Sequence, residues 1–259
     1  AVAMLSAAER ARGVWTISAG NAGQGVAYAA RAAGVPCTVV VIDTAPATKL
    51  ERMRALGATL IQVPFDVAWR AMEVHAFEGL EGSFIHPFDN HDFVAGHATM
   101  ALEILEDAPD AAAIIAAIGG GGLIAGIGAA IKSTQPRIQI VGAEPETGAP
   151  LSLSLASRSP KVFSAWEASF VDGAGGKSVM PRMWERMKDV VDTSIVVSLD
   201  QTAQAMRLMA EKARIIAEGA GALPLAAALT REVGDGPIVA IVSGGNIDLD
   251  KFSALIANA

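Results

Sequence analysis

Short apolar runs alternate with amphipathic stretches along most of the chain. The apolar runs, rich in Val, Ile and Ala, predict buried strands at 13–17, 37–42, 59–63, 83–86, 111–118, 137–143, 193–197 and 237–242. Helical spacing of apolar residues predicts helices at 1–10, 26–33, 48–56, 67–78, 92–105, 123–132, 201–215 and 218–229, and one more at the C-terminal end. Strands that alternate with helices of this length indicate parallel sheets with crossover helices. The pattern therefore predicts an α/β fold.

One stretch breaks this alternation. Residues 147–176 show poor periodicity and many Ser, Gly and Pro residues, which is typical of irregular structure. We expect a loop there with one short helix.

Four consecutive glycines, Gly119–Gly122, separate the apolar run 111–118 from the helical stretch 123–132. Each glycine costs about 0.5–1 kcal/mol in backbone entropy relative to alanine, and strain of this kind concentrates at functional sites. Glycine N–H groups at the start of a helix present donors to an anion without a Cβ in the way. We interpret the loop as a phosphate-binding site; the alternative is a tight turn without a ligand.

Two further turns of small and polar residues follow predicted strands. They are Ser-Ala-Gly-Asn-Ala-Gly-Gln-Gly at 18–25 and Ser-Gly-Gly-Asn at 243–246. Ligands of open α/β sheets bind beyond the carboxyl ends of the strands. Three such turns that converge on one crevice would form a cofactor site.

Composition and charge narrow the class of protein. Of the 259 residues 52% are hydrophobic and 18% charged, which is enough apolar surface for a core, and the net charge is −7 with no basic cluster. This balance argues against nucleic acid or an anionic membrane as a partner, and no apolar run reaches the ~18 residues of a membrane span. The single cysteine, Cys37, lies in an apolar strand, so we expect an inert core thiol and a cytoplasmic protein. No secretion signal is visible, and we expect a further segment before Ala1.

A dinucleotide-binding oxidoreductase is the alternative class. Gly120, Gly122 and Ala125 fit the spacing G-x-G-x-x-G/A, and Glu144 ends the next predicted strand. This interpretation leaves the turns at 18–25 and 243–246 unexplained.

Taken together, the turns resemble those of the fold-type II pyridoxal-phosphate enzymes, specifically the serine/threonine dehydratase and serine racemase family. Residues 18–25 are similar to the family's S-x-G-N-H-x-Q-G turn. The other motifs follow in the family's order: His86-Pro87-Phe88-Asp89 with Ala95-Gly96, then Gly119–Leu123, Glu144-Pro145, Glu218–Ala222 and Ser243–Asn246. The resemblance implies two open, twisted α/β domains of the tryptophan synthase β type. These are a small one near 1–92 and a large cofactor-binding one at 93–259, completed by an N-terminal segment not in this sequence.

The resemblance also implies roles for single residues. The N–H groups of Gly119, Gly120, Gly121 and Gly122 would hold the phosphate of pyridoxal 5′-phosphate. Asn21 would bind the phenolic oxygen of its ring, Ser243 would face its pyridine nitrogen, and Ser18 would take the substrate carboxylate.

The implied reaction is β-elimination from a β-hydroxy amino acid such as L-threonine or L-serine, giving a 2-oxo acid and ammonia. The protein would then be a lyase of amino acid metabolism, a threonine or serine dehydratase, and a homodimer. An amino-acid racemase of the same family and a catalytically silent cofactor-binding homologue remain alternatives.

Three departures from the family pattern matter. None of the seven lysines lies in the family's S-F-K-x-R-G-A context, so we expect the Schiff-base lysine upstream of Ala1. Ala19 stands where racemases carry a serine, which favours dehydration. The metal site of racemase-like members would use Glu144 and Gly148, but Pro150 replaces its aspartate, so a divalent cation is left open and is not predicted.

Overall fold

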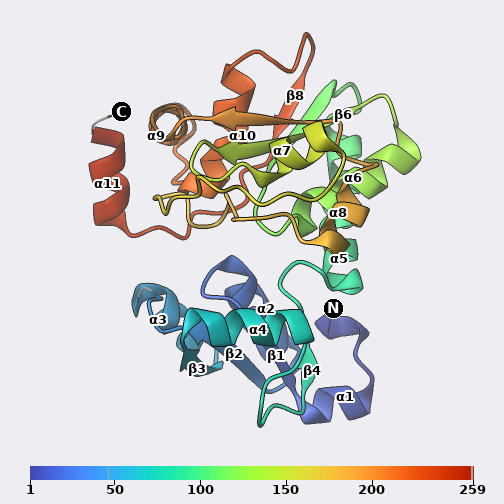
Figure 1. Cartoon of the computed structure of the whole chain (residues 1–259), viewed down its shortest axis with the longest axis vertical. Helices are drawn as coiled ribbons and strands as arrows, with labels where there is room; N and C mark the ends of the chain where they lie inside the picture. The colour runs from blue at the N-terminus through green and yellow to red at the C-terminus, as the bar shows by residue number, and fades with distance from the viewer. Residues whose placement is uncertain (46, 258) are drawn as a thin grey trace. The chain divides into compact units, whose positions relative to one another are not determined.

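The computed structural model describes residues 1–45, 47–257 and 259. The chain divides into two compact units, Ala1–Phe93 and Val94–Ala259 (Figure 1). Each unit is built on its own four-stranded parallel sheet. The predicted α/β class with parallel sheets is confirmed.

The sheet of the first unit has the strand order β3-β2-β1-β4. Its strands are β1 (Val14–Ile17), β2 (Cys37–Ile42), β3 (Thr59–Val63) and β4 (Ser83–Phe84), and the main helices are α2 (Asn21–Ala33), α3 (Ala47–Ala55) and α4 (Phe65–Val74). Alternate residues of a strand point to opposite faces. Val14 and Val39 accordingly pack with α2 and α3, whereas Trp15 and Val40 pack with α4. Both faces of the sheet are covered, as is usual for parallel sheets.

The first ten residues do not form the single helix that we predicted. A 3₁₀-helix η1 (Val2–Met4) is followed by α1 (Ala7–Arg12). Ser6 and Glu9 form a capping box, in which the Ser6 hydroxyl accepts from the Glu9 N–H and the Glu9 carboxylate accepts from the Ser6 N–H. This cap starts a new helix at Ala7.

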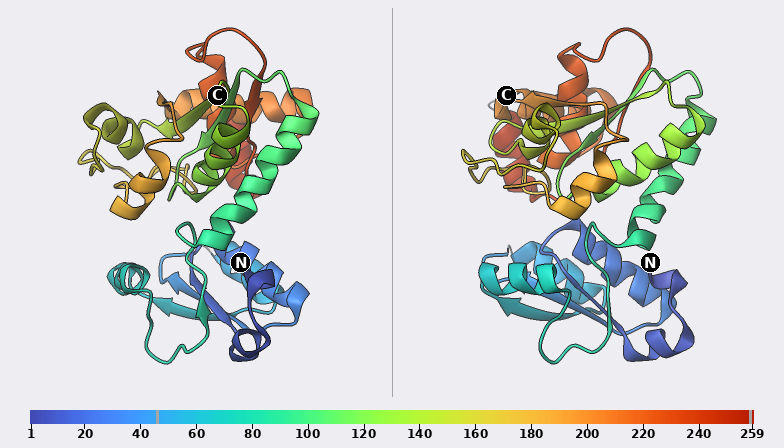
Figure 2. Two further views of the ribbon diagram at one scale, coloured as in Figure 1. Left: turned by 90° about the vertical axis from the view of Figure 1, so that its right-hand side faces the viewer. Right: turned by 45° about the vertical axis from the view of Figure 1, so that its right-hand side comes forward.

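The sheet of the second unit has the order β7-β6-β5-β8. Its strands are β5 (Ala113–Ala117), β6 (Gln139–Pro145), β7 (Thr193–Val197) and β8 (Ile238–Ala240). The helices are α5 (His91–Asp107), α6 (Gly122–Thr134), α7 (Pro150–Ser157), α8 (Pro181–Met187), α9 (Leu199–Leu208), α10 (Gly219–Leu229) and α11 (Leu249–Ala257). Helix α5 begins in the first unit and continues in the second (Figure 2).

The core of the second unit lies mainly between its sheet and two helices. Ile115 and Val141 pack there with Met206 of α9 and Leu223 of α10. Helix α6 also packs against β5 and β6, with its isoleucines buried. The strand β5 is buried along its whole length, so its carboxyl end is held firmly.

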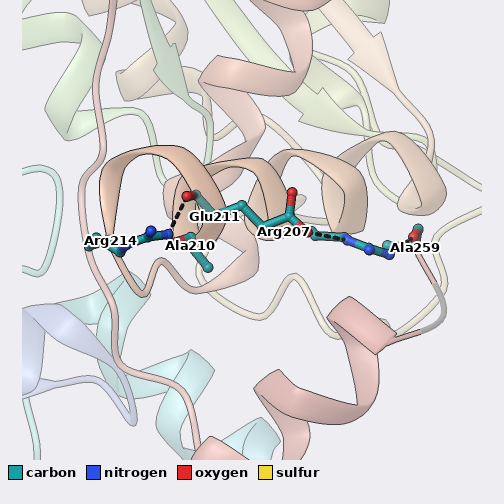
Figure 3. A network of polar contacts seen from close by, with 5 residues as sticks. All are labelled: Arg207, Ala210, Glu211, Arg214 and Ala259. Atoms are coloured by element: carbon teal, nitrogen blue, oxygen red, sulfur yellow. Dashed lines mark hydrogen bonds and ion pairs between the residues drawn. The ribbon is translucent and has the colours of Figure 1, made fainter.

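The predicted helix 201–215 is interrupted. Helix α9 ends at Leu208, a π-helical turn η2 (Met209–Ala213) follows, and Arg214 adopts the left-handed region with φ 61°. Figure 3 shows the polar contacts of this turn: the Arg207 guanidinium donates to the Glu211 carboxylate at 2.9 Å and to the Ala259 carbonyl at 2.7 Å. Arg207 thus links the end of α9 both to the π-helical turn and to the C-terminal residue.

A helix that spans a lipid bilayer needs about 20 predominantly apolar residues. Over the described residues, no helix is long and apolar enough to cross a membrane.

Candidate active site

The glycine loop, Gly119–Gly122, lies at the carboxyl end of the central strand β5. Ile118, the residue before it, is fixed on both sides of its backbone. Its N–H donates to the Ala143 carbonyl at 3.0 Å, and its carbonyl accepts from the Gly175 N–H at 2.8 Å. Helix α6 then begins at Gly122, with Gly121 as its N-cap. The predicted sequence of strand, glycine loop and helix is confirmed.

The N–H groups of the glycine loop are donors without a partner. Across the part of the chain that the structure describes, none of the four N–H groups has a protein acceptor. They precede a helix of 13 residues, whose N-terminus carries a partial positive charge. A phosphate group would satisfy these donors, so the loop fits the phosphate of the cofactor that the resemblance implies.

The glycines are also required by the packing behind the loop. A Cβ on Gly119 would lie 2.8 Å from the Gly173 carbonyl oxygen. Gly121 has φ +90°, and a Cβ there would lie 2.5 Å from Sδ of Met187. Part of the glycine requirement is therefore structural, since it lets the loop sit against α8 and residues 173–175.

Ser243 lies at the same edge of the same sheet. Strand β8 pairs with β5, with Ala240 opposite Ile115, and Ser243 follows β8 as an exposed residue. The turn 243–246 is held against the start of α10, because the Glu218 N–H donates to the Gly244 carbonyl at 3.1 Å. Gly221 permits this approach, since a Cβ there would lie 2.5 Å from that carbonyl oxygen.

Ser18 and Asn21 belong to the first unit. Ser18 follows β1; its N–H donates to the Val40 carbonyl at 3.1 Å, and its hydroxyl accepts from the Gly20 N–H at 3.1 Å. Helix α2 begins at Asn21, not at residue 26 as we predicted. The polar turn is itself the first turn of the helix, because Gly23 allows it to pack closely on the Ser18 carbonyl.

Two of the three predicted turns thus lie at the carboxyl ends of neighbouring strands in one sheet. The turns 119–122 and 243–246 follow adjacent strands of the second unit. The turn 18–25 follows a central strand of the other sheet, so its meeting with the other two stays a prediction.

Glu144, the candidate metal ligand, is fully buried at the end of β6. Its carboxylate accepts from the N–H groups of Leu151 and Ser152 and from the Ser194 hydroxyl, each at 2.8 Å. Burial raises the pKa of this carboxyl, and the three hydrogen bonds oppose the shift. The carboxylate caps α7 and binds β7, and its complete burial keeps it from the ribose that a dinucleotide enzyme would bind.

The second candidate ligand, Gly148, packs on another glycine. A Cβ on Gly148 would lie 2.6 Å from the Gly175 carbonyl oxygen. Within residues 1–45, 47–257 and 259, no group of three or more His, Cys, Asp or Glu side chains could hold a metal ion.

Sequence reasoning missed how residues 161–179 fold. Val162 and Ser178 form an antiparallel bridge, and the Phe163 N–H donates to the Lys177 carbonyl at 2.7 Å. We call this segment the strap. Its periodicity is neither 2 nor 3.6, so only its density of glycines signalled a close approach to other backbone.

The strap also contains Lys177. Its ammonium lies 4.5 Å from the ring centroid of Trp166. The side chain is thus in a cation–π contact.

Comparison with known proteins identifies the family. The sequence profile described as "Pyridoxal-phosphate dependent enzyme" matches residues 1–244. The chain belongs to this family of pyridoxal-phosphate dependent enzymes, and the resemblance drawn from its turns is confirmed.

Individual relatives agree with this assignment. The chain is 39% identical over 259 residues to an L-threonine ammonia-lyase of Thermotoga maritima, covering 98% of this chain and 64% of that protein. It thus spans less than two thirds of the length of this curated relative. Among solved structures, it is similar to processed threonine deaminase isoform 2 of Solanum lycopersicum (TM-score 0.89, 31% identity, 99% of this chain and 76% of that one). Serine racemase of Dictyostelium discoideum gives a TM-score of 0.85 and 34% identity, over 95% of this chain and 80% of that one. The fold is therefore that of the fold-type II enzymes.

Proposed function

We propose that this chain is the cofactor-binding part of an ammonia-lyase that removes water and ammonia from a β-hydroxy amino acid such as L-threonine or L-serine. The observation that carries the proposal is the glycine loop, whose four N–H groups have no acceptor among the described residues. The similarity to an L-threonine ammonia-lyase supports the choice of reaction.

The second unit would hold the cofactor. The N–H groups of Gly119–Gly122 would bind the phosphate, and the exposed Ser243 hydroxyl would face the pyridine nitrogen. Bound pyridoxal phosphate supplies an electron sink for the α-carbon of an amino acid. A neutral hydroxyl leaves the pyridine nitrogen unprotonated, so this sink is weak and elimination of a β-leaving group is favoured.

The first unit would supply side chains. Asn21, in the first turn of α2, would donate to the phenolic oxygen of the cofactor ring. Ser18 and the N-terminus of α2 would bind the substrate carboxylate, since such a terminus attracts an anion. Ala19 offers no proton for the opposite face of the α-carbon, which favours dehydration over racemisation.

The reaction also needs a lysine amine that binds the cofactor and moves the α-proton. None of the seven lysines of this chain lies in the family's S-F-K-x-R-G-A context. The activity is therefore proposed for this chain joined to a segment that contains such a lysine. The same observation supports a second candidate, a cofactor-binding homologue without catalysis.

An assay of ammonia release distinguishes these functions. A protein that joins this chain to a lysine segment of the family should release ammonia from L-threonine or L-serine only when pyridoxal phosphate is present. The matched variant that carries Ala in place of that lysine should release none. Cofactor binding without ammonia release in the intact protein would favour the second candidate. Absence of both would overturn the proposal.

A homodimer and a cytoplasmic location are further proposals. The first rests on the family resemblance, and the second rests on the single cysteine, Cys37. Size-exclusion chromatography with light scattering tests the first. A mass near 26.6 kDa, that of a single chain, would contradict it.

A further inference from the structure

The strap is hydrogen-bonded to the backbone that follows the two neighbouring strands β5 and β6. Its Glu167 N–H donates to the Thr147 carbonyl at 3.0 Å, beyond the end of β6. Its Gly175 N–H donates to the Ile118 carbonyl at 2.8 Å, directly before the glycine loop. The strap, which has no regular secondary structure, is therefore bonded directly to the residue that precedes the proposed phosphate site.

Gly175 is held at both of its polar groups. Its N–H binds Ile118, and its carbonyl accepts from the Trp166 indole N–H at 2.9 Å. Its φ is +72°, and a Cβ there would lie 2.6 Å from Cγ of Pro145. Only glycine fits this position, and the two hydrogen bonds fix the orientation of both peptide groups beside it.

Fixing Ile118 also fixes Gly119. The Ile118 carbonyl and the Gly119 N–H belong to one planar trans peptide group, so they point in opposite directions. Because Gly175 binds the carbonyl on one side of this peptide group, the Gly119 N–H points to the opposite side, away from Gly175. The strap thus fixes the direction of the Gly119 N–H, the first donor of the glycine loop.

Trp166 holds Gly175 through its single polar group. The indole has one donor, its Nε1–H, and this N–H donates to the Gly175 carbonyl. The ring is half-buried, with the Lys177 ammonium at 4.5 Å over it. Gly175 and Lys177 of the strap therefore hold the indole in place.

We propose that Trp166 is a positioning residue for the glycine loop, acting through Gly175 and Ile118 on the direction of the Gly119 N–H. The inference rests on the proposed function of this loop as the phosphate site. It assigns to the strap a role in cofactor affinity as well as in stability.

The test compares two Trp→Phe variants of the full chain. W166F removes the indole N–H and keeps an aromatic ring. W69F is the matched control, because the Trp69 indole N–H donates to the Glu73 carboxylate at 2.8 Å on a helix of the first unit. Thermal unfolding first establishes that both variants fold.

Two readouts are then needed. Without ligand, the Gly119 amide resonance should shift in W166F and stay unchanged in W69F. Inorganic phosphate and pyridoxine 5′-phosphate, which cannot form a Schiff base, should bind W166F about threefold to tenfold more weakly than the parent, the effect of one lost hydrogen bond.

Each outcome decides one point. An unchanged Gly119 resonance in folded W166F would overturn the inference even if no phosphate bound the parent. Equal phosphate affinity of W166F and a binding-competent parent would overturn it and leave the proposed function intact. Failure of the parent to bind either probe would contradict the proposed function, and the resonance of Gly119 would still test the positioning role.

Discussion

The glycine loop and the turn 18–25 look alike in outline and differ in what they offer a ligand. Both follow a central strand of a parallel sheet, and both lead into helices of 13 residues with a glycine N-cap. The glycine loop offers backbone N–H groups alone, which have no acceptors among the described residues. The other turn offers the side chains of Ser18 and Asn21 in addition to the N–H groups at the start of α2. Backbone N–H donors are suited to binding an anion such as a phosphate. Side chains are suited to distinguishing one ligand from another by its functional groups. The comparison therefore predicts that substitutions in the two turns have different consequences.

The largest expected effect is that of Gly121→Ala. The new Cβ would lie 2.5 Å from Sδ of Met187 at a φ of +90°. We expect a loss of about 2–4 kcal/mol in the free energy of unfolding and loss of phosphate binding. Denaturant unfolding and phosphate titration measure the two effects.

Gly25→Ala in α2 is the matched control. Among the described residues, and apart from its chain neighbours and its own helix backbone, no atom lies within 4 Å of the Cβ that it would add. A gain of about 0.5–1 kcal/mol is therefore expected from helix propensity. Equal stability losses at Gly121 and Gly25 would show that the packing behind the glycine loop is not what demands glycine.

A smaller effect is expected from Glu144→Gln. The amide would turn an N–H₂ group toward one of the three donors that Glu144 now accepts from, which should cost about 1–3 kcal/mol at pH 7. Burial raises the pKa of Glu144 above its ordinary value of 4.5. The native state thus holds this proton more tightly than the unfolded chain does. Its contribution to stability is complete below pH 4.5 and is lost as the pH rises through the native pKa.

Glutamine does not titrate. The difference in the free energy of unfolding between the parent and E144Q should therefore grow as the pH is lowered from about 8 to about 4.5. Denaturant unfolding across this range measures it. Glu146→Gln is the control, because that exposed carboxylate caps α9 by accepting from the Leu199 N–H at 2.8 Å. A difference that shrinks toward low pH would contradict the expected direction of this pH dependence.

The smallest effect on stability is expected from Asn21→Ala. Asn21 is exposed in the first turn of α2, so the free energy of unfolding should change by about 0.5 kcal/mol or less. Calorimetric titration should show unchanged affinity for inorganic phosphate and about threefold to tenfold weaker binding of pyridoxine 5′-phosphate. Equal weakening for both probes would remove the distinction between the two turns.

The strands and the glycine loop could be predicted because their signals are local. The predicted bounds 37–42, 59–63 and 193–197 coincide with β2, β3 and β7, since apolar β-branched runs bounded by polar residues leave little choice of conformation. The glycine loop could be predicted from four consecutive glycines between an apolar run and a helical stretch.

The rest depends on contacts between distant segments. The start of α2 depends on how Gly23 packs against Met53, and the Arg207 side chain at the end of α9 binds the distant Ala259 carbonyl. Helix α8 had a signal that went unused, a proline at its first position followed by Met183, Trp184 and Met187 on its buried side. The strap had only its density of glycines as a signal, because its conformation is fixed by hydrogen bonds to Thr147 and Ile118.

The most direct test of the central claim is an NMR titration of the full chain with pyridoxine 5′-phosphate and, separately, with inorganic phosphate. The account predicts that the amide resonances of Gly119, Gly120, Gly121 and Gly122 shift saturably with both ligands. The amides of 18–25, at the helix N-terminus proposed for the substrate carboxylate, should bind inorganic phosphate more weakly than those of the glycine loop. Unchanged glycine-loop amides, or a saturable phosphate response confined to 18–25, would contradict the assignment of the glycine loop as the phosphate site.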